Sequence, residues 1–241
     1  MKVVMIIPAY NEELNIEKTV SKINKYNKKS KNQVDYIVIN DGSTDKTLSV
    51  CRKNNFNVIN LVRNLGIGGA VQTGYKYAYY NNYDVAIQFD GDGQHDEGYI
   101  EHLLKEINNG NDLVIGSRFI KKLSKFTSTK SRQLGIKILS IFIKIFTGEK
   151  VYDPTSGFRA ANKEVIKYFA FNYPIEYPEP YTNAELIKLG YKINEIPVEM
   201  HEREHGVSSI NLSKSFYYMI SVCTSIMMLS FMKRGKKWIV I

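Results

Sequence analysis

The first half of the chain alternates short apolar runs with longer segments in which apolar residues recur every three or four positions. The short runs predict five buried strands, at residues 3–7, 36–39, 57–62, 84–89 and 112–116. The longer segments predict helices at 12–26, 43–54, 66–80 and 97–108, the second with Ser43 or Thr44 as its N-cap. Apolar strands that alternate with helices favour a parallel sheet covered on both faces.

An apolar segment in the second half of the chain differs from these strands. Residues 134–146 are apolar apart from Lys137, Ser140 and Lys144. This pattern predicts an amphipathic helix over 131–147 whose lysines reach the headgroups of a membrane surface. An ordinary core helix is the alternative.

A second apolar segment lies near the C-terminus. Residues 215–232 carry no charge, and the basic sequence KRGKKW follows them. About twenty apolar residues are needed to span a bilayer, and tyrosine, serine and threonine dilute this segment. We therefore expect a main domain at 1–212 and a membrane-associated helix with a basic tail at 213–241; a single embedded helix is the alternative.

Composition narrows the class of protein only slightly. The 241 residues are 44% hydrophobic and 24% charged, which is usual for a packed globular chain. The net charge of +9 suits nucleic acid, anionic lipid or phosphorylated ligands, but no basic and aromatic platform supports nucleic acid. Cys51 and Cys223 form no zinc or disulfide pattern, which favours a reducing cytosol, and the first apolar run is too short for a signal peptide.

Acidic residues and glycines crowd the end of the fourth predicted strand. In the sequence Asp90-Gly91-Asp92-Gly93-Gln94, alternate positions offer oxygen ligands and the glycines allow a tight turn. Oxygen ligands suit Mg²⁺ or Mn²⁺, and an ion with few protein ligands completes its shell with water and substrate phosphates. Since ligands bind beyond the carboxyl ends of parallel strands, a nucleoside diphosphate is the predicted ligand. A solvated turn is the alternative.

Other motif interpretations fit this chain poorly. A calcium loop starting at Asp90 would need glycine where His95 stands. The sequence GIGGAV at 66–71 lacks the last glycine of a dinucleotide-binding loop, and no Walker A sequence is present.

Seven short segments together resemble one enzyme family. They occur in the order PAYNEE, NDGSTDKT, NLGIGGAVQTGY, QFDGDGQHD, DLVIGSRF, DPTSGFRA and EREHGVSS, within residues 1–212. This set resembles family 2 glycosyltransferases of the GT-A fold, which is Rossmann-like with a mostly parallel sheet and helices on both faces. The branch it is most similar to contains dolichyl-phosphate mannose synthases and bacterial polyprenyl-phosphate sugar transferases. The resemblance implies an inverting, metal-dependent hexosyltransferase that uses a UDP- or GDP-sugar.

The resemblance also implies roles for single residues. Nucleotide-binding positions would be Pro8, Tyr10, Glu12, Asp41, Gly68, Gly69, Asp90 and Gly91. The metal, Mg²⁺ or Mn²⁺, would be held by Asp90, Asp92 and Gln94. Catalytic positions would be Asp92, Arg118, Glu179 and Arg203, and the acceptor phosphate would meet Arg132 and Ser208.

The residues indicate the class of donor more directly than the class of acceptor. A polyprenyl phosphate is already an anion and needs no general base, whereas a sugar hydroxyl needs a carboxylate to take its proton. Glu176, Glu179 and Glu185 are candidates for that base, and Glu179 precedes a predicted helix start, where the helix dipole alone also favours an acid.

The amphipathic segments favour the lipid acceptor. We therefore expect a protein on the cytoplasmic face of the cell membrane that contacts anionic lipid, and that docks on a separate small membrane protein. The alternative from another class is a non-catalytic nucleotide-sugar-binding scaffold.

Overall fold

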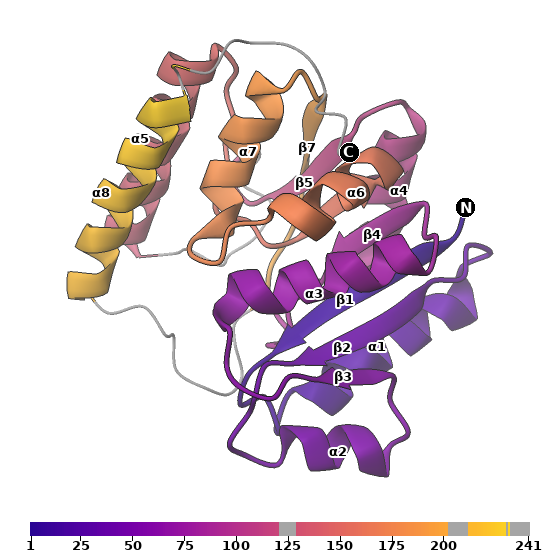
Figure 1. The fold of residues 1–241 in the computed structure, drawn as a ribbon. Helices are drawn as coiled ribbons and strands as arrows, with labels where there is room; N and C mark the ends of the chain where they lie inside the picture. Colours follow the sequence, from indigo (N-terminus) through magenta and orange to yellow (C-terminus); the bar gives the residue numbers. More distant parts are fainter. Residues whose placement is uncertain (121–128, 202–211, 230, 232–241) are drawn as a thin grey trace.

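The computed structural model describes residues 1–120, 129–201, 212–229 and 231, and its centre is one mixed sheet (Figure 1). The sheet has the strand order β3-β2-β1-β4-β6-β5-β7. Its strands are β1 (Val3–Ala9), β2 (Asp35–Asn40), β3 (Val58–Asn60), β4 (Val85–Gln88), β5 (Leu113–Ser117), β6 (Arg159–Asn162) and β7 (Ile193–Pro197). Strand β6 runs antiparallel to both β4 and β5, whereas every other pairing is parallel.

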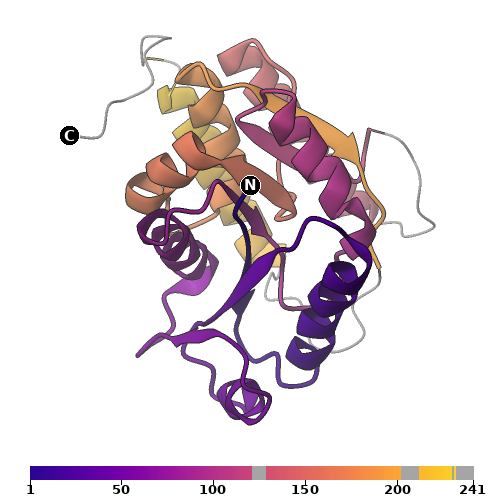
Figure 2. The ribbon, with the colours of Figure 1, turned by 90° about the vertical axis from the view of Figure 1, so that its right-hand side faces the viewer.

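Helices cover both faces of this sheet, as the turned view in Figure 2 shows. They are α1 (Ile16–Lys29), α2 (Thr47–Lys53), α3 (Gly66–Tyr80), α4 (Ile100–Asn108) with the 3₁₀ turn Glu97–Tyr99 before it, α5 (Lys130–Thr147), α6 (Lys163–Asn172), α7 (Pro178–Lys188) and α8 (Leu212–Leu229). Alternate residues of β1 enter two hydrophobic cores: Val4 and Ile6 face one, and Met5 and Ile7 face the other. This is the period of two that a strand buried on both faces requires.

The predicted α/β fold with a mostly parallel sheet is confirmed. Its antiparallel strand is β6, which is inserted between β4 and β5. Hydrophobic spacing does not predict β6, α6 or β7, and one predicted detail needs correction. The predicted cap of α2 is wrong: the helix starts at Thr47, whose backbone N–H donates to Oδ1 of Asp45 over 2.9 Å.

Helices α5 and α8 lie side by side at one edge of the molecule and pack against α7 (Figures 1 and 2). On α5, Leu139 and Ile143 are fully buried, whereas Leu134, Ile141 and Ile145 are exposed. The predicted segment 131–147 thus forms a helix with apolar residues on more than one side. Within the described ranges, we find no helix that combines the length and apolar character needed to cross a bilayer.

Candidate active site

The candidate site begins where β1, β2 and β4 end side by side. The backbone N–H of Asp41, just after β2, donates to the carbonyl of Ala9 over 2.9 Å. The N–H of Gly91, just after β4, donates to the carbonyl of Pro8 over 3.2 Å. A side chain at position 91 would place its Cβ 2.8 Å from that carbonyl oxygen, so Gly91 allows the close approach. The motifs that contain Asp41 and Gly91 therefore meet the PAYNEE motif at the end of β1.

Asp41 is buried and fixes the loop that leads into α3. Its Oδ1 accepts a hydrogen bond from the backbone N–H of Leu65 over 2.7 Å. Burial raises the pKa of Asp41, and the N–H groups of Leu65 and Gly66 partly oppose that shift. The carboxylate therefore joins β2 to the start of α3, beside the position predicted for the nucleoside.

The other side chains of the first motif have different surroundings. Tyr10 is half exposed, whereas Pro8 and Glu12 are buried. A carboxylate oxygen of Glu12 accepts from Nδ2 of Asn15 over 2.6 Å, and its backbone N–H donates to Oγ1 of Thr47 over 2.8 Å. Of these three, Tyr10 is the side chain most available to a ligand.

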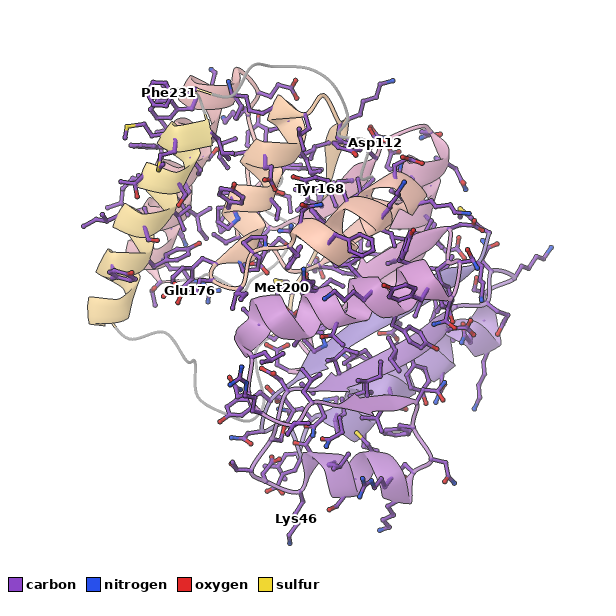
Figure 3. The ribbon with its side chains drawn as sticks, in the orientation of Figure 1. Lys46, Asp112, Tyr168, Glu176, Met200 and Phe231 are labelled. Carbon is purple, nitrogen blue, oxygen red and sulfur yellow. The ribbon has the colours of Figure 1, made fainter. Side chains whose placement is uncertain are left out.

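Gly68 and Gly69 lie in the first turn of α3, where the structure gives both a packing role. A Cβ at position 68 would lie 2.2 Å from the carbonyl oxygen of Ile175, and one at position 69 would lie 2.5 Å from Cβ of Leu65. The close approach seen at Gly68 is therefore to the loop between α6 and α7. Glu176, labelled in Figure 3, lies in that loop near the start of α3.

We expect Gly68→Ala to destabilise the fold by about 1–3 kcal/mol, because a backbone carbonyl must move to admit the methyl group. Thermal unfolding of the variant measures this loss. Gly135→Ala on α5 is the matched control, since its Cβ would meet only Sδ of Met219 at an ordinary 3.6 Å. A melting temperature for Gly68→Ala equal to that of the control would contradict the packing role.

The acidic loop after β4 is held by hydrogen bonds within the loop and to the segment that follows β7. Oδ1 of Asp92 accepts from the backbone N–H of Gln94 over 3.1 Å, and Nε2 of Gln94 donates to the carbonyl of His201 over 3.2 Å. His95 also forms a backbone bridge with Met200, which is labelled in Figure 3. The acidic loop is therefore paired with residues 200–201, which follow β7.

Asp90 is held from two sides. Its Oδ1 accepts from Nε2 of Gln88 over 3.1 Å, and its Oδ2 lies 3.2 Å from Nε2 of His95. Burial alone would raise the pKa of Asp90, but His95, Gln88 and the charge of Arg159 outweigh it and lower the pKa. A Cβ at Gly157 would lie 2.7 Å from Oδ2, so this glycine leaves room for the carboxylate.

These residues fit a hard divalent cation that takes only a few protein ligands. They supply two carboxylates and one amide oxygen from a single loop, and hard cations prefer such ligands. The described part of the chain holds no group of three or more His, Cys, Asp or Glu side chains arranged for a metal. Because this loop offers only a few oxygen ligands, it suits an ion whose remaining ligands are water and substrate phosphates.

The side chain of Arg118, which follows β5, is held by the carboxylate of Asp153 in the DPTSGFRA segment. Its Nε and Nη2 donate to the two oxygens of Asp153 over 2.6 and 2.7 Å, and Nη2 also donates to Oγ1 of Thr155 over 2.9 Å. Asp153 is fully buried. Burial opposes the charge of Arg118, but Asp153 outweighs burial and raises the pKa of the guanidinium.

The other predicted basic and polar positions are only partly described. Arg132 lies in the first turn of α5. Partial desolvation and the charge of Arg118 lower the pKa of Arg132, while Asp153 and Asp92 oppose that shift. The charges of the Arg118–Asp153 pair and of Asp92 in the acidic loop therefore act on Arg132. Arg203 and Ser208 lie outside the described residues.

Glu179 is the second residue of α7, and it follows a strained position. Tyr177 caps the helix with φ 49° and ψ 53°, in the left-handed region that an aromatic residue rarely adopts. Burial raises the pKa of Glu179, and the charge of Arg159 and a hydrogen bond from Gln88 partly oppose this. Glu185, by contrast, is surrounded by Tyr168 and Tyr181, where burial raises its pKa to about 7.

Three groups outside the predicted set of residues border this site. Asp153 and Arg159 both stand in the DPTSGFRA segment, so the signal was present. Tyr218 of α8 packs edge-on against Tyr177, with ring centroids 4.5 Å apart. This contact places α8 beside α7, and burial and the carboxylate of Glu179 raise the pKa of Tyr218.

Comparison with known proteins identifies the family. The model of "Glycosyl transferase family 2" matches residues 4–169. A UDP-N-acetylglucosamine–dolichyl-phosphate N-acetylglucosaminyltransferase of Methanococcus voltae is 31% identical, over 85% of this chain and 87% of its own. The polyprenol monophosphomannose synthase of Mycolicibacterium smegmatis is 26% identical, over 87% of this chain and 81% of its own.

A solved structure shares the fold. Glucosyl-3-phosphoglycerate synthase of Mycobacterium tuberculosis, in complex with Mn²⁺, UDP and phosphoglyceric acid, superposes with a TM-score of 0.71 at 19% identity, over 96% of this chain and 79% of its own. The sheet, the acidic loop after β4 and the family match agree with one another. The chain belongs to glycosyl transferase family 2 and is a glycosyltransferase.

Proposed function

We propose that this enzyme transfers a sugar, with inversion, from a UDP- or GDP-sugar to a polyprenyl phosphate at the cytoplasmic face of a membrane. The observation that carries the proposal is the position of α5, which has Arg132 in its first turn and exposed apolar side chains along its length, and packs against α7. The charges of Arg118 and Asp92 also act on Arg132. A basic group suited to an acceptor phosphate and an apolar surface suited to a lipid on the same helix support a lipid-phosphate acceptor. The relatives named above are named for lipid-phosphate acceptors.

In this mechanism the protein positions two phosphate-bearing substrates. Asp41 and Tyr10 lie at the nucleoside end, and Asp90, Asp92 and Gln94 would hold Mg²⁺ or Mn²⁺. When bound, the ion neutralises charge on the leaving nucleoside diphosphate. Arg132, with Arg203 and Ser208, orients the acceptor phosphate, and Arg118 adds positive potential from its fixed position. Because the nucleophile is already an anion, positioning and charge neutralisation suffice.

Membrane contact is part of the proposal. Lys137 and Lys144 are exposed on α5 beside exposed Leu134, Ile141 and Ile145. Such a surface suits the interface of an anionic membrane, where lysines reach the headgroups. We propose 1–212 as the catalytic domain and 213–241 as a membrane-associated segment that also docks on a separate small membrane protein.

A transferase to a sugar hydroxyl of a lipid-linked glycan is the second candidate. It is favoured by the raised pKa of Glu179 near the acidic loop. Loss of a general base costs about 10²–10⁴-fold in rate, whereas a phosphate acceptor needs no base. We therefore expect Glu179→Gln to keep kcat within about tenfold of wild type, well short of that loss. Steady-state kinetics checks this, with Glu176→Gln as the exposed control.

The acceptor itself is tested by a panel. The protein, Mn²⁺ and each labelled UDP- or GDP-sugar are incubated with a polyprenyl phosphate, a free polyprenol or a lipid-linked glycan. Transfer to the phosphate alone supports the proposal. Transfer to the glycan, lost in Glu179→Gln, would support the second candidate. Metal-dependent nucleotide binding without transfer to any of these acceptors would contradict both candidates.

A further inference from the structure

Arg159 is a fully buried arginine beneath the candidate site. Its Nε and Nη2 donate to the carbonyl of Ser156 over 3.2 and 2.9 Å, and its Nη1 donates to Oγ1 of Thr182 over 3.1 Å. All of these acceptors are neutral. A buried cation is costly unless negative charge lies nearby, so its compensation must come from neighbouring carboxylates.

On the donor side, Arg159 lies across the sheet from Gln88, which donates a hydrogen bond to Asp90. Strands β4 and β6 are antiparallel, and Arg159 lies opposite Gln88 in their register. Nε2 of Gln88 donates to Oδ1 of Asp90 over 3.1 Å. A Cβ at Gly157, two residues before Arg159, would lie 2.8 Å from Nε2 of Gln88. The segment around Arg159 therefore shapes the space in which Gln88 meets Asp90.

On the acceptor side, Arg159 reaches the first turn of α7. Oγ1 of Thr182, which accepts from Arg159, lies 2.7 Å from the carbonyl oxygen of Pro178 and 3.1 Å from that of Glu179. This turn directly follows the left-handed residue Tyr177. A strained conformation persists only where its surroundings hold it. The link through Thr182 is such a restraint.

The polar surroundings of Arg159 are not fully paired. Oε1 of Gln88 and the hydroxyls of Tyr75 and Tyr173 are buried and have no hydrogen-bond partner among the residues that the structure describes. Arg159 acts electrostatically on both tyrosines and on the carboxylates of Asp90 and Glu179. Buried polar atoms in a purely structural network are normally satisfied, so unpaired ones point to a functional role.

We propose that Arg159 is a positioning residue that holds Asp90, through Gln88, and the first turn of α7, through Thr182, from one buried point. It would thereby fix the donor side and the acceptor side of the site relative to each other. The inference rests on the proposed function, because only there does Asp90 serve the donor and does α5, which packs against α7 and carries Arg132, serve the acceptor.

The test separates the two sides with variants of the full chain. Arg159→Met removes the charge, Arg159→Lys keeps it without the planar fork, Gln88→Leu breaks the donor link and Thr182→Val breaks the acceptor link. Calorimetry measures Mn²⁺ binding in the presence of UDP. Kinetics measures kcat and the KM for a short polyprenyl phosphate.

We expect Arg159→Met to raise the acceptor KM by about tenfold or more, because Oγ1 of Thr182 loses the hydrogen bond that the charged guanidinium donates. Mn²⁺ binding should weaken as well, because Arg159 no longer restrains its strand partner Gln88, which holds Asp90. Arg159→Lys should recover part of both effects. Gln88→Leu should change mainly Mn²⁺ binding, and Thr182→Val mainly the acceptor KM. Val165→Ala, a core variant on α6, should lower the melting temperature and leave both constants unchanged.

Arg159→Met with wild-type constants and only a lowered melting temperature, as in Val165→Ala, would overturn the inference. If Arg159→Met does not fold, Gln88→Leu and Thr182→Val decide: separate shifts support the inference, and wild-type constants in both overturn it. If the wild-type protein transfers no sugar to any acceptor, the proposed function fails. Mn²⁺ binding then decides alone, and unchanged binding in Arg159→Met overturns the inference.

Discussion

Replacing Asp92 with asparagine is expected to lower the rate of sugar transfer about 10³-fold while the fold remains intact, because a metal ion contributes several kcal/mol of charge stabilisation. The carboxylate lies partly exposed in the acidic loop, where its Oδ1 accepts from the N–H of Gln94. Asparagine keeps an oxygen for that hydrogen bond and loses the negative charge that attracts the ion. Initial rates at saturating donor and acceptor, over a range of Mn²⁺ concentrations, measure the loss.

Asp84→Asn is the matched control for this variant. Asp84 lies just before β4, at the opposite end of the strand from the acidic loop, and Oδ2 of its side chain accepts from the backbone N–H of Lys2. We expect its rate to equal that of wild type. A rate for Asp92→Asn within about tenfold of wild type, at every Mn²⁺ concentration, would show that Asp92 is no essential ligand.

Replacing Asp153 with asparagine is expected to cost about 3 kcal/mol of folding free energy, because it leaves the guanidinium of Arg118 buried without its counter-ion. Asp153 is fully buried, and the side chain of Arg118 is 10% exposed. Two donors of the arginine fork meet the two carboxylate oxygens, a geometry that asparagine matches in shape but not in charge. Urea unfolding measures the change in free energy.

The double variant Arg118→Met with Asp153→Leu is the control for this pair. Removing both charges avoids the unpaired buried ion, so the double variant should regain much of the stability that Asp153→Asn loses. It should nevertheless remain poorly active, because the positive potential beside the acidic loop is gone. A stability for Asp153→Asn within about 1 kcal/mol of wild type would contradict the structural role of the pair.

Hydrophobic spacing predicted those elements in which the local sequence determines which residues are buried. The helix over 66–80 has the observed bounds of α3, and the strands β1, β2 and β4 read as continuous apolar runs. Strand β6 is Arg-Ala-Ala-Asn, four residues with no strand-like pattern. It is a strand only because β4 and β5 lie on either side of it, and that pairing is a tertiary effect.

The candidate site shows the same contrast between local sequence patterns and tertiary contacts. Asp90, Asp92 and Gln94 stand on one loop, so their spacing alone predicted a shared ligand. The pair of Arg118 and Asp153 joins residues 35 positions apart, which no local pattern shows. Arg159 is part of a recognised segment, but its complete burial, which makes it notable, follows only from the packed fold.

The most direct test of the central claim is a partition measurement. The protein is incubated with Mn²⁺, a labelled UDP- or GDP-sugar and a polyprenyl phosphate, and the label that enters the organic phase is counted. The account predicts organic-phase label that requires Mn²⁺, falls about 10³-fold in Asp92→Asn and persists in Glu179→Gln. Label that stays in the aqueous phase with every donor, while the protein still binds UDP or GDP with Mn²⁺, would contradict it.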